Sequence, residues 1–147
     1  MITIRPLNEQ DLPALLSLYD ELHPGEAGRS ADEDARRQWG RLVAHEGTVC
    51  LGLFRANLLV ASCVLHVLPN LTRGGRPYAL LENVVTASAH RRLGFGRQLL
   101  IAAQEAAWRQ GCYKVMLLTG RLDEGTAAFY RTAGFLDNEK KGFIARP

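Results

Sequence analysis

The most constraining feature of this chain is a stretch in which an apolar strand, a basic turn and a helix follow one another directly. The strand is predicted over residues 78–87, the turn carries Gly94 and Gly96 among arginines, and the helix runs to about Gln110. The first turn of a helix has backbone N–H groups without internal partners and carries the positive end of the helix dipole. Glycine lets an anion approach the main chain, and arginine offers forked donors suited to phosphate. The stretch therefore predicts a cradle for a phosphate-bearing ligand.

The spacing of the turn distinguishes among phosphate-binding patterns. The dinucleotide pattern GxGxxG fails because Leu99 stands where the third glycine is required, and the pattern GxxxxGK(S/T) is absent. The turn Arg91-Arg92-Leu93-Gly94-Phe95-Gly96 instead matches Arg-x-x-Gly-x-Gly. This run resembles the acetyl-coenzyme A signature of the GNAT family of N-acetyltransferases.

A second part of the chain resembles the same family. The aromatic pair Phe129-Tyr130 lies on the next predicted helix and is followed by Gly134-Phe135, in the order and at the separation of the family's closing motif. The segment Gly111-Cys112-Tyr113-Lys114 is similar to glucosamine-6-phosphate N-acetyltransferases within the family. The resemblance covers residues 78–136 closely and the N-terminal half only in the order of its elements.

Periodicity and capping patterns predict the remaining elements. Strands are expected at 2–5, 48–54, 58–68, 78–87 and 112–118, with short terminal strands at 135–136 and 142–145; helices are expected at 11–22, from Ser30 through Val43, at 94–110 and at 123–133. A strand–helix–strand crossover after an antiparallel meander predicts an α/β (α+β) fold, a mostly antiparallel mixed sheet with helices on both faces. This is also the element order of the GNAT fold. The chain is expected to form one domain over residues 1–147.

Composition narrows the class of protein. A chain of 147 residues can build a core without metal or disulfide staples, and its net charge of +3 is too small to argue for a nucleic-acid partner. No apolar run approaches the ~20 residues of a membrane span, and the N-terminus lacks the pattern of a signal peptide. Cys50, Cys63 and Cys112 lie among apolar neighbours and are expected to be reduced thiols, which makes the cytoplasm the default location. No residue spacing matches a metal site.

Acetyl transfer from a thioester to an amine needs a neutral amine, a stabilised oxyanion and a protonated leaving thiolate. Tyr130 suits the last requirement, because a phenol with an ordinary pKa of about 10 can donate a proton without ionising at neutral pH. The family resemblance implies the same role for this tyrosine. The alternative is that a tyrosine following Phe129 on an amphipathic helix is simply part of the core.

Glu82 is the candidate general base or acceptor-positioning residue. It lies two residues before Val84 on the strand that leads to the turn, and strand alternation places the two side chains on one face. A carboxylate on an apolar strand must be paired or solvated, and a raised pKa would let it relay a proton through water. The alternatives are a salt bridge or a solvated strand end.

The resemblance also implies which residues hold acetyl-coenzyme A. The main chain of Val84 and Val85 would pair with the pantetheine arm, and the turn would hold the pyrophosphate through Arg91, Arg92, Leu93, Gly94, Phe95, Gly96 and Arg97. Two positions depart from the family pattern. Asp123 replaces a frequent asparagine and is expected to cap a helix. Arg92 replaces a frequent glycine, and an arginine can adopt the turn provided that φ stays negative.

Other polar residues are weaker candidates. His23 follows the first predicted helix, His66 ends an apolar strand and is expected to be a hydrogen-bonded, partly buried histidine, and His90 precedes the turn. Arg73 and Arg76 are candidates for recognising an acidic acceptor, with loop solubility as the alternative.

The resulting hypothesis is an acetyl-coenzyme A-dependent N-acetyltransferase that acts on the primary amine of a small molecule by direct attack, with an amino sugar phosphate as one candidate acceptor. The first alternative is a non-catalytic module that binds coenzyme A or another nucleotide as a sensor. The second is a nucleic-acid-binding domain that uses its arginines. Since the family often dimerises through its C-terminal strands, the resemblance also implies a homodimer.

Overall fold

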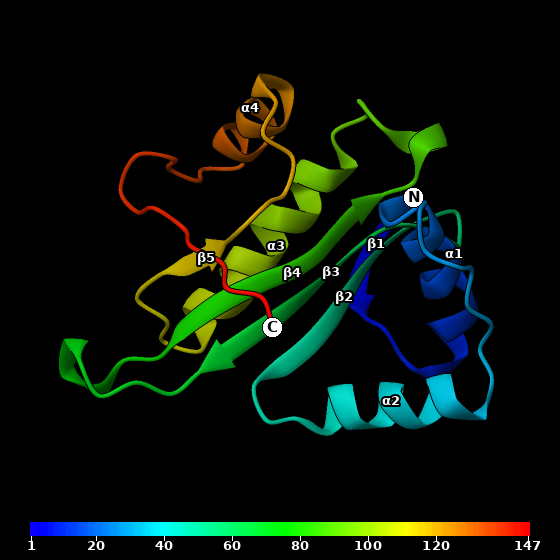
Figure 1. Ribbon diagram of the computed structural model, residues 1–147, viewed down its shortest axis with the longest axis horizontal. Helices are drawn as coiled ribbons and strands as arrows, with labels where there is room; N and C mark the ends of the chain where they lie inside the picture. Colours follow the sequence, from blue (N-terminus) through cyan, green and yellow to red (C-terminus); the bar gives the residue numbers. More distant parts are fainter.

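The computed structural model describes residues 1–147 and is built around one five-stranded sheet, in the order β1-β2-β3-β4-β5 (Figure 1). The strands are β1 (Ile2–Pro6), β2 (Thr48–Arg55), β3 (Leu58–Leu68), β4 (Tyr78–Thr86) and β5 (Val115–Leu117). The helices are α1 (Leu12–Leu22), α2 (Glu33–Ala44), α3 (Phe95–Arg109) and α4 (Glu124–Thr132). Strands β1 to β4 pair antiparallel, and β5 pairs parallel with β4 after the α3 crossover. The predicted α/β fold with a mixed sheet is confirmed.

Helix α3 packs on one face of the sheet. Leu99 and Leu100 of the helix are fully buried in a cluster with Leu53, Leu65 and Leu81, which come from three neighbouring strands. In the view of Figure 1, β4 passes in front of this helix. Burial of these large apolar side chains stabilises the crossover, because each contributes roughly 1.5–3 kcal/mol relative to exposure.

Helices α1 and α2 cover part of the opposite face. Leu15 of α1 and Trp39 of α2 belong to a second buried cluster that includes Cys50, Val64 and Val85 of the sheet. Because successive strand residues point to opposite faces, the two clusters together use both sides of the central strands. The expectation of helices on both faces is therefore correct.

The start of each N-terminal helix differs from the expected cap. The Asp11 carboxylate does not cap α1; it accepts hydrogen bonds from the Arg5 guanidinium at 2.7 and 2.9 Å and from the Asn8 backbone N–H at 2.8 Å. The hydrogen bond from Arg5 holds the pKa of Asp11 below its ordinary value. Helix α2 is capped by Asp32, which accepts from the Ala35 N–H at 2.8 Å, and not by the expected Ser30.

The C-terminal part of the chain contains neither of the two strands expected there. Residues 133–147 have no helix or strand, and in Figure 1 the end of the chain crosses in front of β5 and β4. Strand β5 is three residues long, and the sheet ends with it. Phe143 and Ile144 pair with no strand although the outer edge of β5 is free, and their side chains are 84% and 73% exposed.

None of the helices combines the length and the apolar character that crossing a membrane would require.

Candidate functional site

The candidate site lies where β4 and β5 separate. The two strands share three residue pairs, the last of them Leu81 with Leu117, and β5 ends there while β4 continues to Thr86. The edge of residues 82–86 that faces away from β3 therefore has no strand partner. A cleft of about 1810 Å³ opens at this point, between β4, the ends of α1 and β5, the start of α3, helix α4 and the C-terminal segment.

A β-bulge interrupts β4 inside this cleft. Glu82 pairs with Val64 of β3, whereas Val85 pairs with Ser62, so two residues of β4 stand opposite one residue of β3. Asn83, at the bulge, has φ of +52°. Asparagine is among the few residue types that tolerate this left-handed conformation, because its short polar side chain can hydrogen-bond locally. The bulge therefore shifts the alternation of every later residue in the strand.

The bulge corrects the expected orientation of Glu82. Its partner Val64 belongs to the cluster beneath α1 and α2, as does Val85, so the Glu82 side chain lies on that face. Val84 packs with Leu81 against the α3 cluster on the opposite face. The expectation that Glu82 and Val84 share a face is wrong, because unbroken strand alternation was assumed across Asn83.

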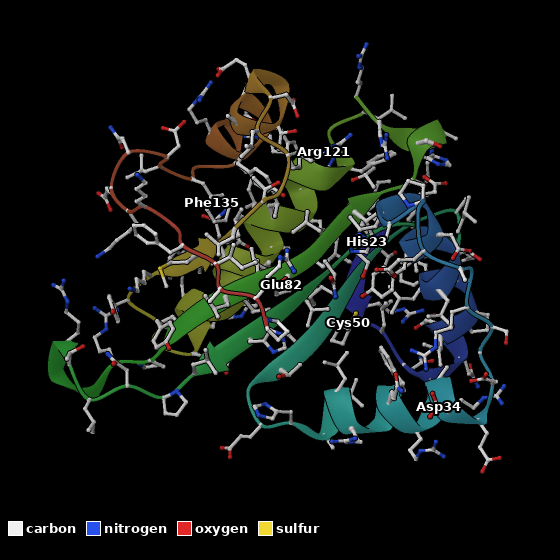
Figure 2. All side chains as sticks on the ribbon, viewed as in Figure 1. His23, Asp34, Cys50, Glu82, Arg121 and Phe135 are labelled. Atoms are coloured by element: carbon white, nitrogen blue, oxygen red, sulfur yellow. The ribbon has the colours of Figure 1, made fainter.

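Glu82 is exposed to solvent and forms no salt bridge. It lines the cleft together with His23, which follows α1. Figure 2 shows Glu82 on β4, with His23 beside the end of α1 and Arg121 on the loop that follows β5. Of the two structural alternatives for this carboxylate, the salt bridge is absent and the solvated position is found.

The turn before α3 forms the predicted cradle. Gly94 has φ of +79° and is the N-cap, no side chain caps the helix, and the first intrahelical bond runs from the Gln98 N–H to the Gly94 carbonyl. The N–H groups of Phe95, Gly96 and Arg97 consequently have no backbone partner. A Cβ atom at Gly94 would meet no other atom within 4 Å, so the turn is open at this residue. The free N–H groups and the helix dipole fit an anionic ligand.

Gly96 also has a packing role that was not expected. It is buried, and a Cβ atom there would lie 2.9 Å from the ring of Phe129 and 2.9 Å from the hydroxyl of Thr86. The missing side chain therefore lets α4 and β4 approach the start of α3.

The arginines of the turn are partly used to hold the structure. Arg97 donates from Nε to the Thr132 carbonyl at 2.8 Å, and Arg91 donates from Nε to the Thr86 carbonyl at 3.2 Å. Arg92 has φ of +62°, so it adopts the turn without the negative φ that was the expected condition for an arginine there. The left-handed conformation costs roughly 1–2 kcal/mol for a side chain other than glycine.

The cleft brings together the predicted site residues with one exception. Leu93 is 53% exposed and does not line it. The residues that do line it are Glu82, Val84, Val85, Arg91, Arg92, Gly94, Phe95, Gly96, Arg97 and Tyr130.

Tyr130 lines the cleft from α4 with its ring half-buried. The ring packs against Phe129 at 5.0 Å between centroids and against the edge of Phe135 at 6.1 Å. Burial raises the pKa of the Tyr130 phenol above its ordinary value, and the positive charge of Arg121 partly offsets this. The hydroxyl group therefore stays protonated at neutral pH, which is the state required of a proton donor.

Asp123 caps α4, as expected. Its carboxylate accepts from the Thr126 backbone N–H at 2.9 Å and from the Thr126 hydroxyl, and these hydrogen bonds lower the pKa of Asp123.

One contact at the cleft was not predicted from the sequence. The Glu21 carboxylate of α1 accepts a hydrogen bond from the Ser88 backbone N–H at 2.6 Å, which ties the end of α1 to the loop before the cradle. No local pattern marks this pair, because the two residues are far apart in the chain. His90, in the same loop, lies outside the cleft, and its buried Nδ1 has no hydrogen-bond partner.

The basic loop after β3 does not extend the cleft. Arg76 donates to the carbonyls of Gly111 and Cys112, and the Arg73 guanidinium lies 5.5 Å from the ring centre of Tyr113. Neither arginine lines the cleft, so the suggested recognition of an acidic acceptor by these two residues has no support in the geometry.

Comparison with known proteins gives consistent matches. The model of the family described as the acetyltransferase (GNAT) family matches residues 12–135. A solved structure of a provisionally assigned acetyltransferase from Agrobacterium tumefaciens str. C58 is 41% identical, with a TM-score of 0.94 over 99% of both chains. A glucosamine 6-phosphate N-acetyltransferase from Trypanosoma brucei brucei is 29% identical over 95% of this chain and 92% of its own. An aminoglycoside N(6')-acetyltransferase type 1 from Serratia marcescens is 26% identical over 95% and 94%.

The packing at Gly96 generates a stability prediction. Gly96→Ala should lower the free energy of unfolding by about 1–3 kcal/mol, because the added methyl group overpacks the contact with Phe129. Gly40→Ala is the matched control, since Gly40 also lies in a helix but has no atom within 4 Å of an added Cβ. Its stability should rise by up to about 1 kcal/mol through helix propensity. Urea unfolding measures both, and equal stability of the two variants would contradict the packing role of Gly96.

Proposed function

This chain belongs to the GNAT acetyltransferase family and is an acetyl-coenzyme A-dependent N-acetyltransferase, and on that premise we propose that its acceptor is a primary amine on a small molecule of the amino sugar class. The observation that carries the proposal is the cleft, which joins the cradle at α3 to an open face of β4 where the Glu82 carboxylate is solvated. The amino sugar class is supported by the relatives named for glucosamine 6-phosphate and for aminoglycosides. An amino sugar phosphate is the specific acceptor to test first.

The cradle is proposed to hold the pyrophosphate of the acetyl donor. The three free N–H groups at the start of α3 lie at the positive end of the helix dipole and can donate hydrogen bonds to an anion. Arg91 and Arg92 add positive charge to the lining of the cleft. The unpaired edge of β4 near Val84 and Val85 is proposed to pair with the pantetheine arm. Acetyl-coenzyme A supplies the acetyl group as a thioester, and these contacts position it beside β4.

Tyr130 is proposed as the general acid. Its hydroxyl group borders the cleft, its ring is fixed by Phe129 and Phe135, and burial keeps the phenol protonated. A proton held in this state can be delivered to a thiolate leaving group. The aromatic contacts also limit the rotation of the ring, so the proton is held in one place.

Glu82 is proposed as the general base, acting through water. Its carboxylate is exposed on the face that α1 borders and forms no salt bridge, so its oxygens are free to accept a proton. An acceptor amine bound as ammonium must lose a proton before it attacks, and a solvated carboxylate next to the cleft can receive that proton.

We also propose a cytoplasmic location and a homodimer. The three cysteines are free and buried, in keeping with a reducing compartment. Leu118, Phe143 and Ile144, which also line the cleft, expose apolar surface beside the free edge of the sheet, and this surface supports a second copy as a partner.

Gly94→Glu should abolish binding of coenzyme A, because a carboxylate would then stand at the open point of the cradle. Gly94→Asn is the matched control, since asparagine tolerates the left-handed conformation and adds no charge. Isothermal titration calorimetry with coenzyme A measures both. If Gly94→Glu bound coenzyme A with the wild-type affinity, the cradle would not be the pyrophosphate site.

Tyr130→Phe should lower kcat by about 10²-fold with little change in the affinity for acetyl-coenzyme A, because only the proton donor is lost. Tyr113→Phe removes a hydroxyl group outside the cleft and should leave kcat unchanged. Thiol release with glucosamine 6-phosphate as acceptor gives kcat. An unaltered kcat in Tyr130→Phe would exclude this residue as the acid.

Glu82→Gln should lower kcat/KM for the acceptor by about 10²-fold at neutral pH. The defect should shrink as pH rises, because the amine then loses its proton in bulk water and no longer needs the carboxylate. Glu105→Gln, an exposed change on α3, is the control. A defect of the same size at every pH would indicate a positioning role for Glu82 in place of proton transfer.

A further inference from the structure

A second cavity lies on the face of the sheet that carries Glu82. It has a volume of about 390 Å³ and lies between the C-terminal half of α2 and the neighbouring ends of β2 and β3. It shares no lining residue with the cleft, and the residues that line it are Gln38, Arg41, Leu42, His45, Thr48 and His66. Figure 1 shows α2 along the border of the sheet, with the chain returning from its end into β2. The proposed acetyl transfer uses none of these residues.

The lining of the cavity includes a hydroxyl group that lies between two imidazoles. The Thr48 Oγ1 lies 3.2 Å from Nδ1 of His45 and 2.9 Å from Nδ1 of His66. A hydroxyl group has one proton, so when it donates to one ring it must accept from the other. In the neutral state one ring therefore presents an N–H at Nε2 and the other presents a lone pair.

Both Nε2 atoms are available to a ligand. Neither has a hydrogen-bond partner in the protein, and neither is a buried unsatisfied atom. If the ring that presents the lone pair is protonated, each ring has one N–H donor at its Nε2 atom, and both hydrogen bonds to Thr48 are kept.

The one permanently charged side chain that lines the cavity is positive. Arg41 forms no salt bridge, and no carboxylate lines the cavity. The nearby Asp34 carboxylate on α2 is already bound by Arg29, Arg37 and the Gln38 amide. Glu46 follows His45 in the chain but lies outside the lining. A divalent cation is disfavoured, because no group of three His, Cys, Asp or Glu side chains converges here.

We propose that this cavity binds a small tetrahedral oxyanion, a phosphate group or a chemical equivalent, with the Arg41 guanidinium and the Nε2 atoms of His45 and His66 as donors. The guanidinium fork and two imidazole N–H groups supply charge-assisted hydrogen bonds to such an anion.

The anion has two possible sources, the phosphate of the acceptor or a free ion. His66 is two residues along β3 from Val64, which pairs with Glu82, so the Cα atoms of His66 and Glu82 are roughly 8 Å apart by strand geometry. That separation suits an acceptor whose amine reaches Glu82 while its phosphate reaches the cavity. The first source, the phosphate of the acceptor, rests on the proposed function. Binding of a free ion is independent of that function.

Calorimetric titration with sodium sulfate, at an ionic strength held constant with sodium chloride, tests the site directly. We expect saturable binding at one site, weakened about tenfold or more by Arg41→Gln. Thr48→Val should weaken binding, because the two imidazole rings lose the hydroxyl group that orients them.

Arg36→Gln is the matched control, since Arg36 is an exposed arginine on α2 outside the cavity. It should bind sulfate like the wild type. Heats that do not saturate, or equal affinities in Arg41→Gln and Arg36→Gln, would overturn the anion site whether or not the protein acetylates an amine.

Acceptor kinetics then distinguish the two sources. If the acceptor's phosphate occupies the cavity, Arg41→Gln raises KM for glucosamine 6-phosphate about tenfold and leaves KM for glucosamine unchanged, and sulfate competes with the phosphorylated sugar. If the site serves a free ion, Arg41→Gln loses sulfate binding while both KM values stay at the wild-type level. Because sulfate binding is measured without acetyl transfer, failure of the proposed acceptor class is separable from failure of the anion site.

Discussion

The separation of β4 from β5 is the constraint on which the rest of the site depends. Three residue pairs join the strands, and beyond Leu81 the outer edge of β4 has backbone groups with no strand partner. Unpaired backbone groups away from water are costly, so such an edge is sustained beside a solvent-filled cleft or a ligand. The start of α3 and the face of α4 border the same opening. The break in strand pairing thus leaves the free edge of β4 and the cradle at the start of α3 open to the same cleft.

The cradle and the proposed acid are mechanically connected. Gly96 allows Phe129 of α4 to pack against the start of α3, and Arg97 binds the carbonyl of Thr132 at the end of the same helix. Tyr130 is next to Phe129 and is held by its ring. A distortion of the turn therefore displaces the phenol as well as the phosphate-binding N–H groups. The two family landmarks, separated in sequence, form one packed unit.

Two faces of the sheet give the two proposed proton-transfer groups opposite environments. Tyr130 packs on the α3 cluster and is desolvated, which favours its neutral form. Glu82 lies on the α1 and α2 face and is solvated, because the bulge at Asn83 separates its orientation from that of Val84. The same face continues along β3 to His66 and the cationic cavity. We therefore expect this face to recognise the phosphate of an acceptor and to remove the proton from its ammonium group.

The sequence by itself determined the strand–turn–helix at 78–110, the cap at Asp123 and the aromatic pair, because these depend on local spacing, helix capping and apolar periodicity. It did not determine the positive φ of Arg92, the packing role of Gly96, the missing C-terminal strands or the face of Glu82. For three of these the deciding contact is distant in the chain: Phe129 packs at Gly96, β3 pairs across the bulge, and residues 142–145 do not pair with the free edge of β5. Only the tertiary structure decided them, because pairing and packing select among conformations that the local sequence leaves nearly equal in energy.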